Sequence, residues 1–83
     1  MKIQVRYFAA LREALGAQET VELPVGSTLG SLRDQLIASS PRHAEVLARG
    51  RALRGAVNQA MSDDRTPVPE GAEVAFFPPV TGG

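Results

Sequence analysis

Polar and apolar positions alternate along the first residues of the chain. The apolar positions of this segment share one parity, and they are Ile3, Val5 and Tyr7. Because successive side chains of a strand point to opposite faces, the alternation predicts a half-buried strand. Thr20 to Leu23 alternates in the same way. We expect these two strands to pair in antiparallel fashion, with a short helix between them from Ala9 to Leu15 that ends at Gly16.

The longest apolar stripe at helical spacing follows Ser27 and Thr28, either of which is a suitable N-cap. The residues of the stripe are Leu29, Leu32, Leu36 and Ile37. Their spacing places them on one face of a helix, which we expect to be the main helix of the domain. Gly30 lies inside it and costs about 1 kcal/mol relative to Ala. We therefore expect the first turn to be either loose or packed closely against the sheet.

The second half of the chain contains three further predicted elements and a final strand. Ser40-Pro41 predicts a break and the start of a second short helix, which ends at Gly50. Leu53 to Val57 predicts a strand, and Asn58 to Met61 predicts a turn into another brief strand. Glu73 to Phe77 is nearly continuously apolar, so we expect a strand that is covered on both faces and central in the sheet.

This order of elements predicts an α+β domain with one main helix packed across a small mixed sheet. If the first and last strands lie side by side, they are parallel and the arrangement is a β-grasp. At 83 residues, the chain has room for one domain only. We assign residues 1–77 to this β-grasp domain and residues 78–83 to an extended C-terminal tail.

Composition narrows the classes of function. The formal net charge is zero, which removes the usual electrostatic case for nucleic acid as the main partner. The chain has no Cys, so it has neither a disulfide framework nor a Cys-based zinc site, and we expect a cytoplasmic protein. No segment approaches the length of a membrane span, so no membrane partner is expected. The basic segment from Arg42 to Arg54 predicts either a solvated face or a contact with an acidic partner or phosphate.

Candidate catalytic groups are scarce. His43 is the only histidine, so we expect neither a His metal cluster nor a Ser/His/Asp triad, and we place His43 on a helix surface. Asp63 and Asp64 lie in a polar loop, where they predict a solvated turn rather than an acid/base pair. The Gly- and Ser-rich stretch from Gly26 to Ser31 contains no Lys and fails as a P-loop. We therefore expect no cofactor or metal bound by this chain and no catalytic machinery of its own.

The last residues of the sequence are the best candidate for a functional group. Pro78 and Pro79 follow the last predicted strand, have no N–H to continue its ladder, and favour an extended exit. Gly82 and Gly83 carry no side chains and fit a channel too narrow for other residues, although a frayed terminus is the alternative. Residues 78–83 reach at most roughly 20 Å, at about 3.3 Å per residue, so the Gly83 carboxylate can enter a neighbour's pocket.

Chemistry at this carboxylate has to be supplied by another protein. A carboxylate is a poor electrophile, but joining it to a nucleotide phosphate creates an acyl-adenylate with a good leaving group. A sulfur donor then displaces that group and leaves a thiocarboxylate, whose sulfur is a far better nucleophile than oxygen. A bare carboxyl tail on a chain without catalytic groups is thus typical of a substrate and carrier.

Three stretches resemble the small subunit of molybdopterin synthase. They are Ala56-Val57-Asn58-Gln59, the Glu70-Gly71 turn, and above all the run from Glu73 to Gly83, which includes Phe76-Phe77-Pro78-Pro79-Val80-Thr81-Gly82-Gly83. The similarity extends from end to end and is weakest from Pro41 to Gly55. It implies a ubiquitin-like β-grasp fold and a sulfur carrier of molybdenum cofactor biosynthesis.

The resemblance also implies partners and roles. A separate adenylating enzyme uses ATP to activate the terminal carboxyl, and sulfur transfer leaves a thiocarboxylate on Gly83. The tail from Pro78 to Gly82 inserts into the large catalytic subunit. There the sulfur reaches a cyclic pyranopterin monophosphate precursor and builds the dithiolene of molybdopterin. Two small and two large subunits form the implied heterotetramer.

Strand parity suggests where partners dock. If Ile3, Val5 and Tyr7 face the core, Phe8 turns outward, and the adjacent Phe76 and Phe77 cannot share a face. Phe8, Phe77 and Met61 are therefore candidates for an exposed apolar patch that binds partners. The alternative is that all three belong to the core of a two-layer domain.

Two other functions remain open from the sequence. A sulfur carrier for thiamine biosynthesis would use the same tail chemistry, and only the stretch from Phe76 to Thr81 argues against it. A ubiquitin-like binding module or protein modifier would instead have an inert tail or one that is coupled to lysines.

Overall fold

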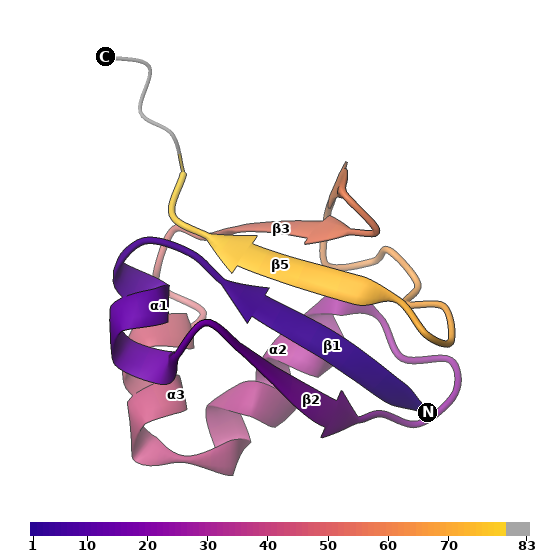
Figure 1. Ribbon diagram of the computed structural model, residues 1–83, viewed down its shortest axis with the longest axis horizontal. Helices are drawn as coiled ribbons and strands as arrows, with labels where there is room; N and C mark the ends of the chain where they lie inside the picture. The colour runs from indigo at the N-terminus through magenta and orange to yellow at the C-terminus, as the bar shows by residue number, and fades with distance from the viewer. Residues whose placement is uncertain (80–83) are drawn as a thin grey trace.

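A five-stranded mixed sheet carries three helices on one face in the computed structural model, which describes residues 1–79 (Figure 1). The elements are β1 (Lys2–Tyr7), α1 (Ala10–Leu15), β2 (Gln18–Glu22), α2 (Leu29–Ser39), α3 (Pro41–Leu47), β3 (Arg54–Val57), β4 (Ala60–Ser62) and β5 (Glu73–Phe77). The strand order is β2-β1-β5-β3-β4. β1 and β5 pair in parallel, and the other described pairings are antiparallel. The predicted β-grasp arrangement is confirmed.

The hydrophobic core lies between the helices and one face of the sheet, which we call the inner face. Val5 is opposite Val74 and Tyr7 is opposite Phe76, so alternate residues of β1 and β5 project to this face. All four side chains are buried. The helices and loops complete the core with Leu11, Leu23, Leu29, Leu32, Leu36, Leu47 and Val68.

Helix α2 begins with a reciprocal cap. The Thr28 hydroxyl accepts a hydrogen bond from the Ser31 N–H at 3.2 Å, and the Ser31 hydroxyl accepts one from the Thr28 N–H at 2.8 Å. Gly30 then donates its N–H to the Asp64 carbonyl at 3.0 Å, and a Cβ on Gly30 would lie 3.0 Å from the Asp64 Cβ. The first turn is therefore closely packed, and at Gly30 the neighbour is the loop at Asp64 rather than the sheet.

Two element boundaries differ from the sequence prediction by two residues or more. β2 begins at Gln18 rather than Thr20, and α3 ends at Leu47 rather than near Gly50. The end of α3 is set by a side chain and not by a glycine. Arg33, from α2, donates to the carbonyls of Leu47 and Ala48, which the helix itself leaves without partners.

β5 is central in the sheet as predicted, but the prediction that both its faces are covered is wrong. Val74 and Phe76 are buried on the inner face, whereas Glu73, Ala75 and Phe77 on the opposite face are only half-buried. The three helices of residues 1–79 cover one face of the sheet, and the other face, which we call the outer face, is open (Figure 1). In the same residues, no helix is both long and apolar enough to cross a bilayer.

Candidate functional site: the tail exit and its surroundings

The described chain leaves the sheet at the carboxyl end of β5. β5 ends at Phe77, and the half-buried Pro78 and Pro79 follow it without strand structure. This exit lies beside the end of the parallel strand β1 and above α1 (Figure 1). The remaining predicted tail residues lie outside the described residues, and they are Val80, Thr81, Gly82 and Gly83.

The predicted partner-binding residues all lie on the outer face or at its end. Phe8 is 40% exposed and Met61 is 62% exposed, whereas Phe77 is half-buried. The cross-strand row Ala75, Ala56 and Met61 joins them on this face. We call Phe8, Ala56, Met61, Ala75 and Phe77 the outer patch. The sequence prediction did not include the two alanines, although the alternation of β3 and β5 places both on the same face as Phe77.

Charged side chains border the outer patch. The Arg6 guanidinium lies 5.6 Å from the centre of the Phe8 ring and 3.7 Å from the Glu73 carboxylate. Arg54 is opposite Phe77 in the β3–β5 register and is exposed. An apolar centre with a charged rim is the usual composition of a protein-binding surface.

His43 is not the surface residue that the sequence predicted. Its side chain is 16% exposed, and Nε2 lies 2.7 Å from the Glu19 carboxylate. Glu19 also accepts a hydrogen bond from the buried Tyr7 hydroxyl at 2.7 Å. Glu19 faces inward because it is opposite Val5 in the β1–β2 register. His43 thus connects α3 to β1 and β2 through Glu19.

The environment of Tyr7 disfavours its ionised form. Burial raises the pKa of the Tyr7 phenol far above its ordinary value, and the hydrogen bond to the Glu19 carboxylate raises it further. The hydroxyl therefore remains a donor throughout the physiological range and does not act as a base.

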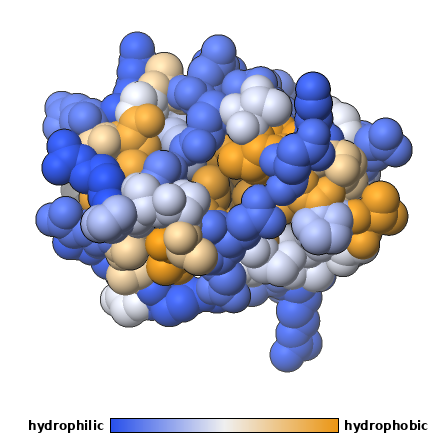
Figure 2. Space-filling model, turned by 90° about the horizontal axis from the view of Figure 1, so that it is seen from below, coloured by the Kyte–Doolittle hydropathy of each residue, from blue (hydrophilic) through white to orange (hydrophobic). Residues whose placement is uncertain are grey.

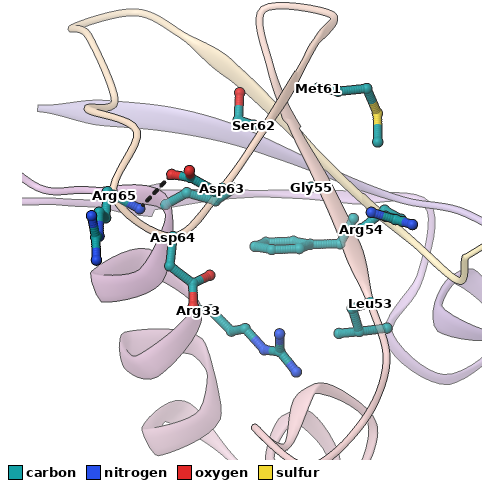
Figure 3. A pocket seen from close by; sticks show the side chains of 11 residues that line it. Arg33, Leu53, Arg54, Gly55, Met61, Ser62, Asp63, Asp64 and Arg65 are labelled. Carbon is teal, nitrogen blue, oxygen red and sulfur yellow. Dashed lines mark hydrogen bonds between the residues drawn. The ribbon is translucent and has the colours of Figure 1, made fainter.

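A cavity of about 760 Å³ opens between α2 and the β3–β4 edge (Figure 3). Leu29, Leu53 and Phe76 form its apolar walls, and the charged lining residues are Arg33, Arg54, Asp63, Asp64 and Arg65. Three of these charged groups are engaged within the chain. Arg33 binds backbone carbonyls, the Asp63 carboxylate accepts from the Arg65 N–H at 2.9 Å, and Asp64 pairs with Arg49.

Arg33 is the one charged residue among the buried residues of the described chain. Burial lowers its pKa from the ordinary value, and the Arg49 charge lowers it further. Its guanidinium donates to the carbonyls of Leu47, Ala48 and Arg51. Since these carbonyls lie at and after the C-terminus of α3, a positive charge is favourable there. The burial of Arg33 is explained by this contact.

The arginines of the basic segment from Arg42 to Arg54 differ in whether they bind other residues of the chain. Arg49 pairs with Asp34 and Asp64, and this pairing holds the pKa of the Asp34 carboxyl below its ordinary value. Arg42 donates to the Ala14 carbonyl at 3.3 Å. By contrast, Arg51 and Arg54 are exposed and form no ion pair with any residue of the described chain.

The surface seen from below the view of Figure 1 has apolar side chains in several clusters, with charged and polar side chains between them (Figure 2). Within residues 1–79, no group of three or more His, Cys, Asp or Glu side chains is arranged to hold a metal ion. The tail exit and the outer patch are the strongest candidate site, because exposed apolar residues lie there beside the end of β5.

Comparison with known proteins decides the family. A profile of the ThiS family matches residues 5–83. The chain belongs to the ThiS family. It is 43% identical over 81 residues to the molybdopterin synthase sulfur carrier subunit of Escherichia coli (strain K12), which covers 98% of this chain and 99% of that protein. The predicted resemblance is confirmed, and the chain is a member of the group of such carrier subunits within this family.

Solved structures share the fold of this ThiS-family chain. SAMP1 from Haloferax volcanii is 25% identical and covers all of both chains with a TM-score of 0.80. A ubiquitin from Caldiarchaeum subterraneum, 17% identical, covers 100% of this chain and 98% of its own with a TM-score of 0.64, which shows the ubiquitin-like fold alone. A chain in the complex of subunits 1 and 2 of the molybdopterin-converting factor from Helicobacter pylori 26695 is 25% identical, with a TM-score of 0.69 and full coverage of both chains.

Proposed function

We propose that this chain carries sulfur for molybdenum cofactor biosynthesis on the carboxyl group of Gly83. The observation that carries the proposal is the full-length, 43% identity to a molybdopterin synthase sulfur carrier subunit. The fold supports it, because β5 and the prolines after it direct the chain away from the sheet beside a surface suited to protein contacts. The tail residues Pro78, Pro79, Val80, Thr81 and Gly82 serve to insert Gly83 into a partner.

The proposed chemistry takes place in two partners. In an adenylating enzyme, a Gly83 carboxylate oxygen attacks the α-phosphorus of ATP, and pyrophosphate leaves. A sulfur donor at the oxidation level of sulfide then attacks the acyl carbon, a C–S bond forms and AMP leaves. The resulting thiocarboxylate enters a large catalytic subunit, where its sulfur attacks a carbon of a cyclic pyranopterin monophosphate precursor and displaces an oxygen substituent. Water then cleaves the acyl–sulfur bond and regenerates the Gly83 carboxylate, and a second thiocarboxylated chain supplies the second sulfur of the dithiolene. ATP is thus a cofactor of the activating partner.

The proposed complex has two small and two large subunits. A chain of similar fold occurs in a complex of subunits 1 and 2 of a molybdopterin-converting factor, which supports a large-subunit partner. The outer patch, with Phe8, Met61 and Phe77, is the surface that we assign to both partners. Its apolar residues and charged rim fit a surface that contacts other proteins.

Intact mass tests the proposal. The purified chain is incubated with the adenylating enzyme from the same genome, ATP and a sulfur source. We expect a mass gain equal to the exchange of one oxygen for one sulfur, and no gain when ATP is omitted. The absence of a gain with an enzyme that is active on another carrier would contradict the proposal.

Two controls separate this function from its alternatives. A chain that lacks Gly83 should neither gain sulfur nor support dithiolene formation, because the next carboxyl group is one residue short of its position. Addition of the large subunit and precursor then distinguishes this pathway from thiamine biosynthesis. Coupling of the tail to lysines without any sulfur gain would favour a protein modifier.

A further inference from the structure

A second apolar surface lies at the base of the tail, on the side away from the outer patch. It is a groove of about 320 Å³, and its apolar lining residues are Ala10, Leu11, Val46, Ala52, Leu53 and Pro78. We call it the tail-base groove. Its position is set by three segments that meet there: α1, α3 and the loop that enters β3.

The groove is open to solvent and is not a gap in the core. Leu11 is buried at 4% exposure and forms part of the core, whereas Ala10 and Ala52 are exposed on its walls. Arg51 is the only charged residue among those lining the described groove. The Arg51 side chain is exposed and forms no ion pair with the described residues, so its charge is available to a partner.

The length of the tail limits how far a partner can be from this groove. Pro78 lines the groove, and five residues follow it in the sequence. At about 3.3 Å per residue, they place the Gly83 carboxylate no more than roughly 17 Å from Pro78. A protein that surrounds this carboxylate must therefore approach the tail base closely.

The usual size of an interface leads to the same conclusion. A stable complex buries about 800 Å² on each partner, which corresponds to a disc with a radius of roughly 16 Å. A disc of this size around the tail exit extends beyond Phe8 and Phe77 on the outer face. It also covers the opposite side of the exit, where Ala10 and Pro78 form the groove.

We propose that the tail-base groove binds an apolar side chain of the large catalytic subunit, with a carboxylate beside it that pairs with Arg51. This inference rests on the proposed function, and it adds a second contact on the other side of the tail. The large subunit then holds the base of the tail from two directions. Fixing Pro78 in this way reduces the conformational entropy that is lost when the last residues enter the active site.

The test compares two exposed alanines. In Ala52→Arg a long side chain occupies the groove, and in the matched control Ala38→Arg the same side chain is added to the exposed face of α2. The dissociation constant for the large subunit is measured by titration calorimetry with the complete chain. We expect Ala52→Arg to weaken binding roughly tenfold or more relative to Ala38→Arg, as for the central contacts of interfaces.

A second variant guards against local misfolding. Ala10→Arg blocks the groove from the α1 wall, and urea unfolding reports whether each variant keeps the stability of the parent. Arg51→Glu should weaken binding as well, because it places like charges together. If the three groove variants bind the large subunit as tightly as Ala38→Arg does, the inference is overturned.

This outcome differs from a failure of the proposed function. If the parent chain binds the large subunit but gains no sulfur, the proposed carrier function is contradicted. The dissociation constants of the groove variants still test the groove inference. If the parent gains sulfur and the groove variants bind normally, the carrier function stands and the groove inference falls. If the parent gains sulfur but does not bind the large subunit, the groove inference also falls.

Discussion

At the scale of single residues, the most informative group is the buried hydroxyl of Tyr7. Its ring belongs to the core beside Phe76, at a centroid distance of 6.5 Å, while its hydroxyl binds Glu19. His43 completes this contact from α3. The Tyr7 hydroxyl therefore ties two strands and a helix together at the edge of the core, and the energy of the contact depends on the phenol keeping its proton.

This dependence predicts instability at high pH. The pKa of Tyr7 is raised in the folded chain, whereas the unfolded chain has the ordinary value of about 10. Above that pH the unfolded state loses the proton and the folded state keeps it, so the free energy of unfolding falls by about 1.4 kcal/mol per pH unit. Urea unfolding over this range should show the decline.

Tyr7→Phe is the control for this prediction. The variant lacks the titrating group, so its free energy of unfolding should decline less steeply than that of the parent above a pH of about 10. The difference between the two slopes should be about 1.4 kcal/mol per pH unit. It should also be less stable at neutral pH, by roughly 1–3 kcal/mol, because Glu19 loses a buried donor. Equal slopes for the parent and the variant would show that Tyr7 ionises as readily in the folded state as in the unfolded one.

At the scale of elements, the contact between β3 and α2 depends on the absence of a side chain. Gly55 lies on the inner face of β3, and a Cβ there would be 2.7 Å from Cδ2 of Leu29. Leu29 is buried at 3% exposure and starts α2, so its side chain must shift toward the cavity that it borders to admit a methyl group. The glycine sets how closely the main helix approaches the sheet.

Gly55→Ala should therefore lower the free energy of unfolding by about 1–3 kcal/mol, as overpacked cores do. Gly50→Ala is the matched control, because nothing lies within 4 Å of its added Cβ and its φ is not in the left-handed region. That change should be neutral or stabilise the chain by up to about 1 kcal/mol. Chemical denaturation of both variants gives the comparison, and an equal effect would show that Leu29 yields at little cost.

The elements also show what the sequence could and could not predict. Strand alternation and the helical stripe predicted β1, β2 and α2, and turn residues and the final apolar run predicted the other described elements, because these patterns follow from local geometry. They did not predict where α3 ends, since that depends on Arg33 from another helix. They misplaced His43 for the same reason: its partner, Glu19, is on a distant strand. The outer patch was partly predictable because parity alone decides which face Phe8 and Phe77 occupy.

At the scale of the whole molecule, the inner and outer faces of the sheet have separate roles. The inner face holds the fold together, and changes there affect stability. The outer face contributes little to the core, so its exposed apolar residues can change without unfolding the chain. Met61 and Val25 are both exposed and apolar, at 62% and 86%, but only Met61 lies on the outer patch.

This difference separates binding from stability. Met61→Ser and Val25→Ser should each change the free energy of unfolding by less than about 0.5 kcal/mol, as is usual for exposed positions. Met61→Ser should weaken binding to the large subunit by about 1–2 kcal/mol, or roughly five- to thirtyfold, because it removes an apolar contact from the patch. Val25→Ser should bind as the parent does, since its turn is remote from the tail. Similar affinities for both variants would mean that the large subunit reaches the tail without contacting the β4 side of the patch, which would limit its contact with the outer patch to the side of Phe8 and Phe77.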